Sequence, residues 1–180
     1  MVELLLALAL AILTIVTGRD WPLLLLLLIV IVLPGLWATR TGAPSLPTRK
    51  KTLDQMLKLA NIKPHEHVYD LGCGDGRIVF AAAKAGAHAT GYEFSLPMYL
   101  IAKLGSYAHS GTRIEYKNFW TQDYADADVI FCYLLTSSMQ TFKHKIWPNL
   151  KPDCRVVSHA FRMDGVAPTA EKNGVILYVK

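Results

Sequence analysis

Cysteine is scarce in this chain of 180 residues, and the few cysteines show no paired spacing. There are three, Cys73, Cys132 and Cys154, and no two of them form a C-x-x-C pair. An odd number without such spacing argues against a disulfide framework and against a structural zinc site. The histidines, cysteines and aspartates show no metal-ligand spacing either, so we expect no bound metal. We expect each cysteine to be a small apolar residue on or beside a buried strand.

Charge is nearly absent from the first forty positions, which hold much of the chain's apolar content. Residues 2–17 and 21–38 are apolar runs, separated by Gly18, Arg19 and Asp20. One long helix would place both charges deep in lipid, at a cost of at least about 2.5 kcal/mol each. A hairpin would instead place them in a turn at the interface. A membrane-spanning helix needs about 20 apolar residues, so the second run is long enough and the first is marginal. The sequence therefore predicts a transmembrane helical hairpin over residues 1–38.

A cleaved signal peptide is the competing interpretation of this segment. The absence of a basic stretch at the start, the presence of Glu3 and the second apolar run all argue against it. Basic residues follow the second run closely, namely Arg40, Arg49, Lys50 and Lys51. Because positive charge collects on the cytoplasmic side, we expect the remainder of the chain there, with residues 39–47 as a linker and residues 48–180 as one domain.

The stretch from Asp70 to Gly76 is the strongest local signal in the sequence. An apolar strand over residues 67–71 stops in a glycine-rich turn, and a helix starts at Ile78. Glycine has no Cβ, so a ligand can lie directly against such a turn, where the free N–H groups of the helix also point. The dinucleotide fingerprint is G-x-G-x-x-G, whereas here the third glycine comes one residue early. The spacing fits S-adenosylmethionine better, with Asp70 facing its ammonium group. The alternative is a turn that binds nothing.

Glu93 is the second candidate for cofactor binding. It ends a predicted strand over residues 87–93, roughly 20 residues beyond the glycine turn. A carboxylate in this position accepts hydrogen bonds from ribose hydroxyls in adenosine-binding α/β folds. The alternative is an acidic residue that happens to lie in a loop.

Strands and helices alternate along the rest of the chain, which predicts a doubly wound α/β sheet with a reversed edge. The helix over residues 96–108 is expected to turn Leu96, Leu100, Ile101 and Leu104 inward. The predicted strands cover residues 67–71, 87–93, 113–117, 128–133 and 154–159, with a hairpin of residues 166–172 and 175–179. The other predicted helices cover residues 48–60, 78 to about 86, and 137–147.

Several motifs together resemble a known family: YDLGCGDGRIV, GYEF, NFW, DVIFCYLL and RVVSHAF. They resemble the seven-stranded class I S-adenosylmethionine-dependent methyltransferases. More narrowly, they resemble the small lysine methyltransferases of the mitochondrial adenine nucleotide translocase and the ATP synthase c-subunit, with their prokaryotic relatives. That family also carries a hydrophobic anchoring segment ahead of its catalytic domain. The resemblance covers about residues 47–180 and implies a Rossmann-like seven-stranded methyltransferase sheet behind the N-terminal transmembrane hairpin.

The resemblance implies roles for individual residues. Asp70, Gly72 and Gly74 would hold the methionine end of the cofactor, Glu93 the ribose, and Asn118 with Phe119 the adenine. Many class I relatives have an aspartate where this chain has Asn118. The full set expected at the cofactor is Asp70, Leu71, Gly72, Cys73, Gly74, Glu93, Phe94, Asn118, Phe119 and Tyr133.

Three residues are candidates for the catalytic side of the site. Tyr133 would face the reacting centre, and Thr48 would close the pocket from the N-terminal side. His159 is a candidate proton acceptor. The alternatives are a packed core tyrosine at position 133 and, at position 159, a strand-end histidine that is satisfied by backbone.

The function that follows is methyl transfer from S-adenosylmethionine to a lysine of a membrane-embedded or membrane-adjacent protein, by an enzyme held at the lipid bilayer. Anchoring would raise the local substrate concentration. Two alternatives remain: a methyltransferase for a lipid-borne small molecule, such as a quinone precursor or an aminophospholipid, and a non-catalytic cofactor-binding membrane module. A nucleic-acid substrate is not expected, because Cys132-Tyr133-Leu134-Leu135 stands where an Asn/Asp-Pro-Pro-Tyr motif would be.

Overall fold

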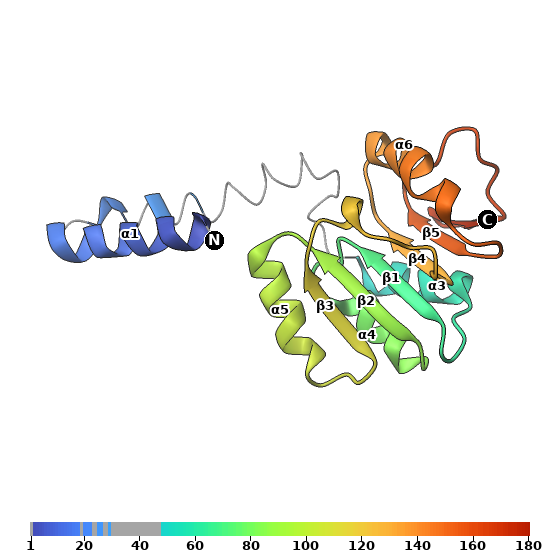
Figure 1. Cartoon of the computed structure of the whole chain (residues 1–180), viewed down its shortest axis with the longest axis horizontal. Coiled ribbons are helices and arrows are strands. Elements are labelled where there is room, and N and C mark those ends of the chain that lie inside the picture. The colour runs from blue at the N-terminus through green and yellow to red at the C-terminus, as the bar shows by residue number, and fades with distance from the viewer. Residues whose placement is uncertain (1, 19, 23–24, 27–28, 30–47) are drawn as a thin grey trace. The chain divides into compact units, whose positions relative to one another are not determined.

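A computed structural model of the chain describes residues 2–18, 20–22, 25–26, 29 and 48–180, and divides into two compact units, Met1–Arg40 and Thr41–Lys180 (Figure 1). The first unit contains helix α1, Val2–Thr17, which coincides with the first apolar run. Within the residues so described, no helix is both long and apolar enough to cross a membrane. Most of the second predicted hairpin helix, and all of the predicted linker 39–47, lie outside the described residues.

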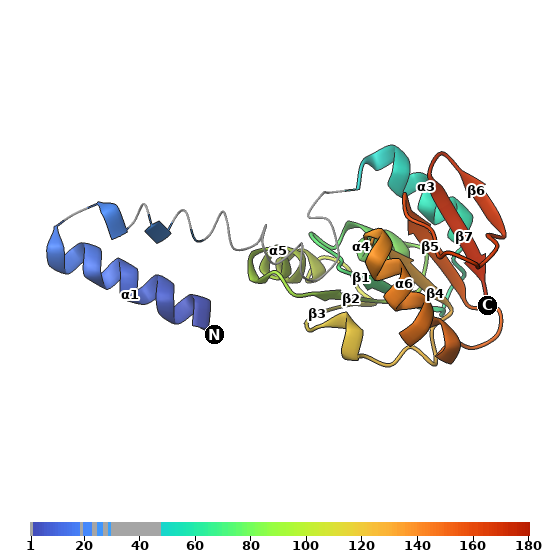
Figure 2. The same ribbon diagram turned by 90° about the horizontal axis from the view of Figure 1, so that it is seen from above.

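The second unit is built on one seven-stranded sheet in the order β3-β2-β1-β4-β5-β7-β6. Figure 2 shows β3 at one end of the sheet and β6 at the other. The strands are β1 His67–Leu71, β2 His88–Glu93, β3 Thr112–Tyr116, β4 Val129–Cys132, β5 Arg155–His159, β6 Ala170–Lys172 and β7 Val175–Val179. The predicted α/β sheet is therefore confirmed.

One detail of the predicted sheet is wrong. Strands β1 to β5 run parallel, and β7 pairs antiparallel with both β5 and β6. The reversed strand is thus not at the edge, because β6 pairs along its outer side. The hairpin was predicted correctly, but the sequence does not show on which side of β7 its first strand lies.

The order of the strands has a switch point in the middle of the sheet. From β1 the chain moves outward to β2 and β3, then returns to form β4 on the opposite side of β1. At such a switch point the loops leaving β1 and β4 diverge, and ligands of open α/β sheets bind outside the carboxyl ends of these strands. The glycine turn follows β1 and Tyr133 follows β4, so both stand at this point.

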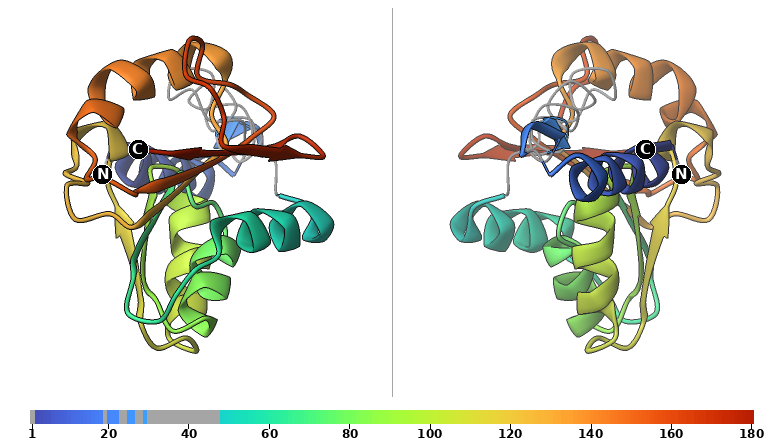
Figure 3. Two further views of the ribbon diagram at one scale, coloured as in Figure 1. Left: turned by 90° about the vertical axis from the view of Figure 1, so that its right-hand side faces the viewer. Right: turned by 90° about the vertical axis from the view of Figure 1, so that its left-hand side faces the viewer.

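Helices cover the sheet on both faces, as Figure 3 shows for α3 and α6. Helices α3 Lys50–Ala60, α4 Arg77–Lys84 and α5 Leu96–Ser106 pack on one face, where Met56, Val79 and Ala102 meet Phe131. Helix α6, Thr136–Lys145, packs on the other face with the short 3-10 helices η1 Phe119–Thr121 and η2 Trp147–Asn149. All three cysteines are buried free thiols, as the sequence predicted.

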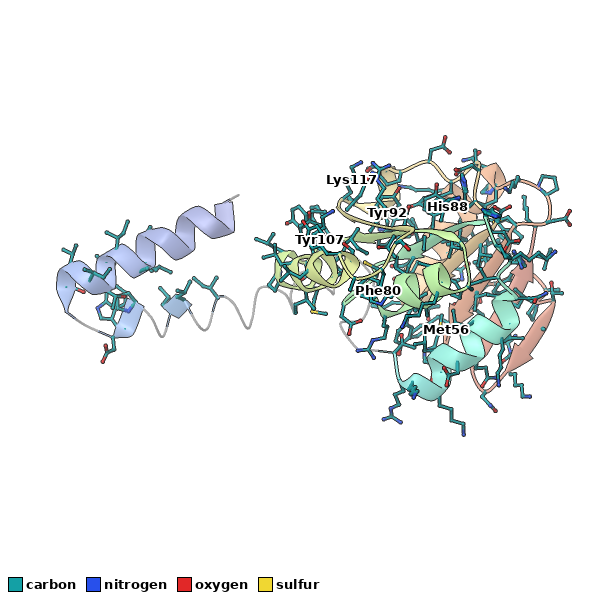
Figure 4. All side chains as sticks on the ribbon, turned by 90° about the horizontal axis from the view of Figure 1, so that it is seen from below. Met56, Phe80, His88, Tyr92, Tyr107 and Lys117 are labelled. Atoms are coloured by element: carbon teal, nitrogen blue, oxygen red, sulfur yellow. The ribbon has the colours of Figure 1, made fainter. Side chains whose placement is uncertain are left out.

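The predicted inward face of α5 is wrong for three of its four residues, and the fourth, Leu96, is partly buried. Leu100, Ile101 and Leu104 are 49%, 53% and 71% exposed, and Ala102 is the residue of this helix that is fully buried. Gly105 also faces inward, because a Cβ there would lie 2.8 Å from the ring of Phe80 on α4. Figure 4 labels Phe80 where these two helices meet. Close packing on small residues has turned the large apolar residues outward.

Candidate active site

The glycine turn after β1 is held against β2 by backbone hydrogen bonds. The N–H groups of Gly72 and Cys73 both donate to the carbonyl oxygen of Tyr92, at 2.9 and 3.0 Å. Gly72 and Gly74 have φ angles of 82° and 56°, a region that glycine adopts without strain. Gly91 of β2 makes room for the turn, because a Cβ there would lie 2.7 Å from Cys73 Sγ. The loop is therefore fixed in place by its neighbour strand.

The carboxylate of Glu93 points at this loop. Its Oε2 accepts a hydrogen bond from Gly74 N–H at 2.8 Å, and its Oε1 accepts from the N–H groups of Phe94 and Ser95 at 2.9 and 2.7 Å. Sequence spacing suggested that Glu93 would stand beside the loop, and the structure places it there. The three backbone bonds were not foreseen, since they depend on how the chain turns after β2. They fix the orientation of the carboxylate, and each oxygen retains lone pairs that can face a ligand.

Asp70 is a buried acid with an unsatisfied atom. Its side chain is 4% exposed, and its Oδ2 has no hydrogen-bond partner among the described residues. Burial, with the nearby negative charges of Glu93 and Asp75, raises the pKa of the Asp70 carboxyl to about 8. Buried polar atoms are nearly always paired, so an orphan one calls for an explanation. A ligand with an ammonium group would supply the missing partner, and the sulfonium amino acid of S-adenosylmethionine carries one.

Two charged residues near the loop were missed by the sequence interpretation. Arg77 Nε donates to Asp75 Oδ1 at 2.8 Å, and Arg77 Nη1 donates to the backbone oxygen of Thr48 at 2.6 Å. The guanidinium holds the pKa of the Asp75 carboxyl below its usual range. The signal in the sequence was an acid and an arginine two positions apart inside the turn. Through Arg77, the predicted pocket-closing residue Thr48 is tied to the glycine loop.

The residues expected at the adenine lie beyond the ends of β2 and β3. Asn118 caps η1, with its Oδ1 accepting the N–H of Trp120 at 3.0 Å. Phe119 is buried, with its ring centroid 4.6 Å from that of Trp120. Phe94 stacks on Tyr116 at 5.4 Å with an interplanar angle of 9°. Because β2 and β3 are adjacent and parallel, these aromatic side chains share the edge of the sheet that Glu93 also occupies.

Tyr133 and His159 come together beyond the ends of β4 and β5. Their ring centroids are 4.6 Å apart, and Phe161, which the sequence interpretation missed, lies 6.1 Å from Tyr133. Tyr133 is only half-buried, so it is not a fully packed core tyrosine. His159 Nδ1 is buried and has no partner in the part of the chain that the structure describes, so the backbone-satisfied alternative is wrong for this atom. Burial lowers the pKa of His159 and favours its neutral form.

Comparison with known proteins agrees with this arrangement. Residues 70–170 match a family model described as the ANTKMT methyltransferase domain, which is more than half of the 180 residues. A protein-lysine N-methyltransferase from Saccharolobus islandicus is 36% identical over 132 residues, which covers 69% of this chain and 81% of that protein. The adenine nucleotide translocase lysine N-methyltransferase of Mus musculus is 30% identical, over 73% of this chain and 58% of its own length. The chain thus spans little more than half of the mouse enzyme.

Among solved structures, an RNA methyltransferase from Salinibacter ruber in complex with S-adenosyl-L-homocysteine aligns with a TM-score of 0.68 at 32% identity. The alignment covers 74% of this chain and 92% of that one. The fold, the glycine loop at the switch point and the orphan carboxyl of Asp70 agree with these similarities. The chain therefore belongs to the ANTKMT family of class I S-adenosylmethionine-dependent protein-lysine N-methyltransferases.

Proposed function

We propose that this enzyme methylates lysine side chains of a membrane-embedded or membrane-adjacent protein, while residues 1–38 anchor it to the bilayer. The arrangement of Asp70 and Glu93 on either side of one glycine loop is the observation that carries the cofactor site. The lysine methyltransferases of Saccharolobus islandicus and Mus musculus, as relatives, support lysine as the acceptor. When bound, S-adenosylmethionine supplies an electrophilic methyl group on a sulfonium.

Each part of the loop region suits one part of that cofactor. The carboxylate of Asp70 would pair with the ammonium group, and the backbone from Leu71 to Gly74 would lie against the methionine end. Glu93 would accept hydrogen bonds from the ribose hydroxyls. Phe94, Asn118 and Phe119 would border the adenine, where the Asn118 oxygen already serves as a helix cap and its amide group is left to face the ring.

For methyl transfer, the residues of this chain would form a site that keeps a lysine amine neutral and aligns it. A free lysine amine has a pKa of ~10.4 and is mostly protonated at neutral pH. The rings of Tyr133, His159 and Phe161 form a partly apolar wall that would lower this pKa by desolvation. An amine held against this wall would be placed to accept the methyl group that the cofactor supplies when bound. The neutral imidazole of His159 would orient the amine or take its proton. The remaining rate enhancement would come from alignment of the amine with the methyl group.

The membrane part of the proposal depends on the N-terminal segment of the chain. Helix α1 is apolar, residues 21–38 repeat that composition, and a basic group follows. The positive-inside rule would place the catalytic domain, residues 48–180, on the cytoplasmic side, joined by the linker 39–47.

The test is to incubate the full chain and radiolabelled S-adenosylmethionine with membranes. We expect label on a protein band that resists nuclease and organic solvent, and that maps to methylated lysine. Nuclease-sensitive label would indicate an RNA substrate, the acceptor class of the Salinibacter ruber enzyme, and solvent-extractable label would indicate a lipid-borne one. Cofactor binding without transfer to any fraction would indicate a non-catalytic module. Asp70→Asn is the inactive control, and Glu171→Gln on β6 is its matched control at the far edge of the sheet.

A further inference from the structure

Helix α5 exposes large apolar side chains along one side. Leu100, Ile101, Leu104 and the helix-ending Tyr107 are 49%, 53%, 71% and 80% exposed, and together they are here named the apolar face of α5. Figure 4 labels Tyr107 at the end of this helix. Among the described residues 48–180, only Tyr116 and Val179 are other large hydrophobic residues with comparable exposure. A contiguous patch of this kind marks an interaction surface more often than single exposed residues do.

The outward orientation of this face is built into the packing. The inward side of α5 includes two small residues, with Ala102 fully buried and Gly105 in contact with the ring of Phe80, while Tyr99 packs beside them against the core. Turning the helix over would bring leucine side chains into a space where even one Cβ would lie 2.8 Å from Phe80. The helix is therefore apolar on both sides, and Leu100, Ile101 and Leu104 lie on the outer one.

Acidic residues are absent from α5 and from the segments on either side of it. Residues 94–114 contain no aspartate or glutamate, and Lys103 lies within the helix. Large apolar residues beside a lysine, without acids, suit a helix that lies in the headgroup region of an anionic membrane. A protein partner would not require this absence of acidic residues over the whole segment.

Residues 39–47 limit how far the catalytic domain can lie from a bilayer that holds residues 1–38. Thr48 follows the linker and is held to the glycine loop through Arg77, at the carboxyl edge of the sheet. Helix α5 begins at the same edge, where Met98 Cε lies 3.9 Å from the position of a Cβ on Gly74. Residues 39–47 can span at most about 32 Å. If a bilayer holds residues 1–38, Thr48 therefore lies within about this length of chain from it.

We propose that the apolar face of α5 rests on the surface of an anionic phospholipid bilayer. The inference depends on the membrane part of the proposed function, but not on the identity of the methyl acceptor. It adds a second attachment besides the N-terminal segment and fixes the orientation of the domain. Lysines close to the membrane–water interface are then the class of substrate that the site can reach.

A dye on α5 tests this directly in the full chain. A polarity-sensitive nitrobenzoxadiazole dye is attached to Leu104→Cys and, as the matched control, to His144→Cys, which is exposed on α6 across the sheet. The native cysteines are buried, and the unsubstituted chain measures their background labelling. The vesicles contain equal parts of phosphatidylcholine and phosphatidylglycerol, with or without a doxyl-labelled quencher lipid.

On vesicles we expect the dye at position 104 to shift to shorter wavelength and to be quenched by the doxyl lipid, while the dye at 144 stays in water. If the chain floats with vesicles and the dye at 104 remains in water, the inference is wrong and the anchor stands. A dye at 104 that is shielded without lipid, in a particle of twice the mass, would show that a second copy covers the face. A chain that does not float with vesicles overturns both the anchor and the inference, and neither result bears on methyl transfer itself.

Discussion

Charged side chains are usually exposed and large apolar ones buried, and Asp70 and Leu104 are opposite exceptions to this rule. Asp70 is an acid that is 4% exposed with an unpartnered oxygen, and Leu104 is a leucine that is 71% exposed. Each lies on a regular element, a strand or a helix, whose packing holds it there. Local violations of this kind are expected at functional sites. Under the two proposals above, the site of Asp70 is complementary to a cation and the site of Leu104 to the surface of a bilayer.

The largest expected effect comes from removing the charge of Asp70. Asp70→Asn should weaken binding of S-adenosylhomocysteine by about 100- to 5,000-fold, because losing one partner of a buried ion pair costs about 3–5 kcal/mol. Calorimetric titration of the full chain measures this. Equal affinity of the two proteins would mean that Asp70 does not hold the ammonium group.

The same substitution should stabilise the unliganded protein at alkaline pH. The pKa of Asp70 is raised from 3.8 to about 8, so the folded state binds this proton more tightly than the unfolded state. Stability from this group is therefore complete below about pH 4 and is lost progressively up to about pH 8. Loss of affinity together with a gain in stability is a result that a merely structural role of Asp70 would not give.

Filling the space behind the loop should have the next largest effect. Gly91→Ala places a Cβ 2.7 Å from Cys73 Sγ and 2.8 Å from Val79 Cγ2. Overpacking of this kind costs about 1–3 kcal/mol in the free energy of unfolding, which urea denaturation measures. Thr90→Ala, the next position along β2, is the control and should change it by less than about 1 kcal/mol. If Gly91→Ala were neutral, the loop would have room to move away from β2.

The pH dependence of binding sharpens the assignment of Asp70. Between about pH 6 and pH 8 the affinity for S-adenosylhomocysteine should rise by up to about tenfold per pH unit, because the carboxyl must lose its proton to pair with the ammonium. Titrations in two buffers of different ionisation enthalpy should detect one released proton at pH 6. In Asp70→Asn this proton release should disappear, and its persistence would assign it to another group.

The smallest effect is expected at Leu104, the exposed residue of the comparison. Leu104→Ala should change the free energy of unfolding in solution by less than about 0.5 kcal/mol, since the side chain is exposed. Met56→Ala on α3 is the contrast, because Met56 is fully buried and its truncation costs about 2–5 kcal/mol. A large loss for Leu104→Ala without lipid would mean that the apolar face of α5 is already covered by protein.

The two places also differ in how far the sequence reveals them. The spacing of Asp70, Gly72 and Gly74, with a carboxylate at the end of the next strand, was enough to predict the loop and the side on which Glu93 stands. Such motifs are local, and the parallel sheet brings strand ends together by rule. The link from Asp75 through Arg77 to Thr48 was not predicted, because it joins positions 29 residues apart.

Hydrophobic periodicity could not predict which face of α5 packs against the sheet. Apolar residues occupy nearly every position from Leu96 to Gly105, so no face is distinguished by hydrophobicity alone. The contact of Gly105 with Phe80 decides which side packs, and it depends on the distance between two helices. In α3, by contrast, Leu53, Met56, Leu57 and Ala60 recur at helical spacing among polar positions, and this single apolar face packs against the core.

The central claim is that the glycine loop and Glu93 together hold the methyl donor. Titration of the full chain with S-adenosylhomocysteine tests it, with Glu93→Ala compared with Glu171→Ala, a carboxylate that pairs with Arg162 at the far edge of the sheet. We expect saturable binding that Glu93→Ala weakens by about tenfold or more, since hydrogen bonds to a charged group contribute about 1.5–3 kcal/mol, and that Glu171→Ala leaves unchanged. Absence of saturable binding in the unsubstituted chain, or equal affinity in Glu93→Ala, would contradict the account.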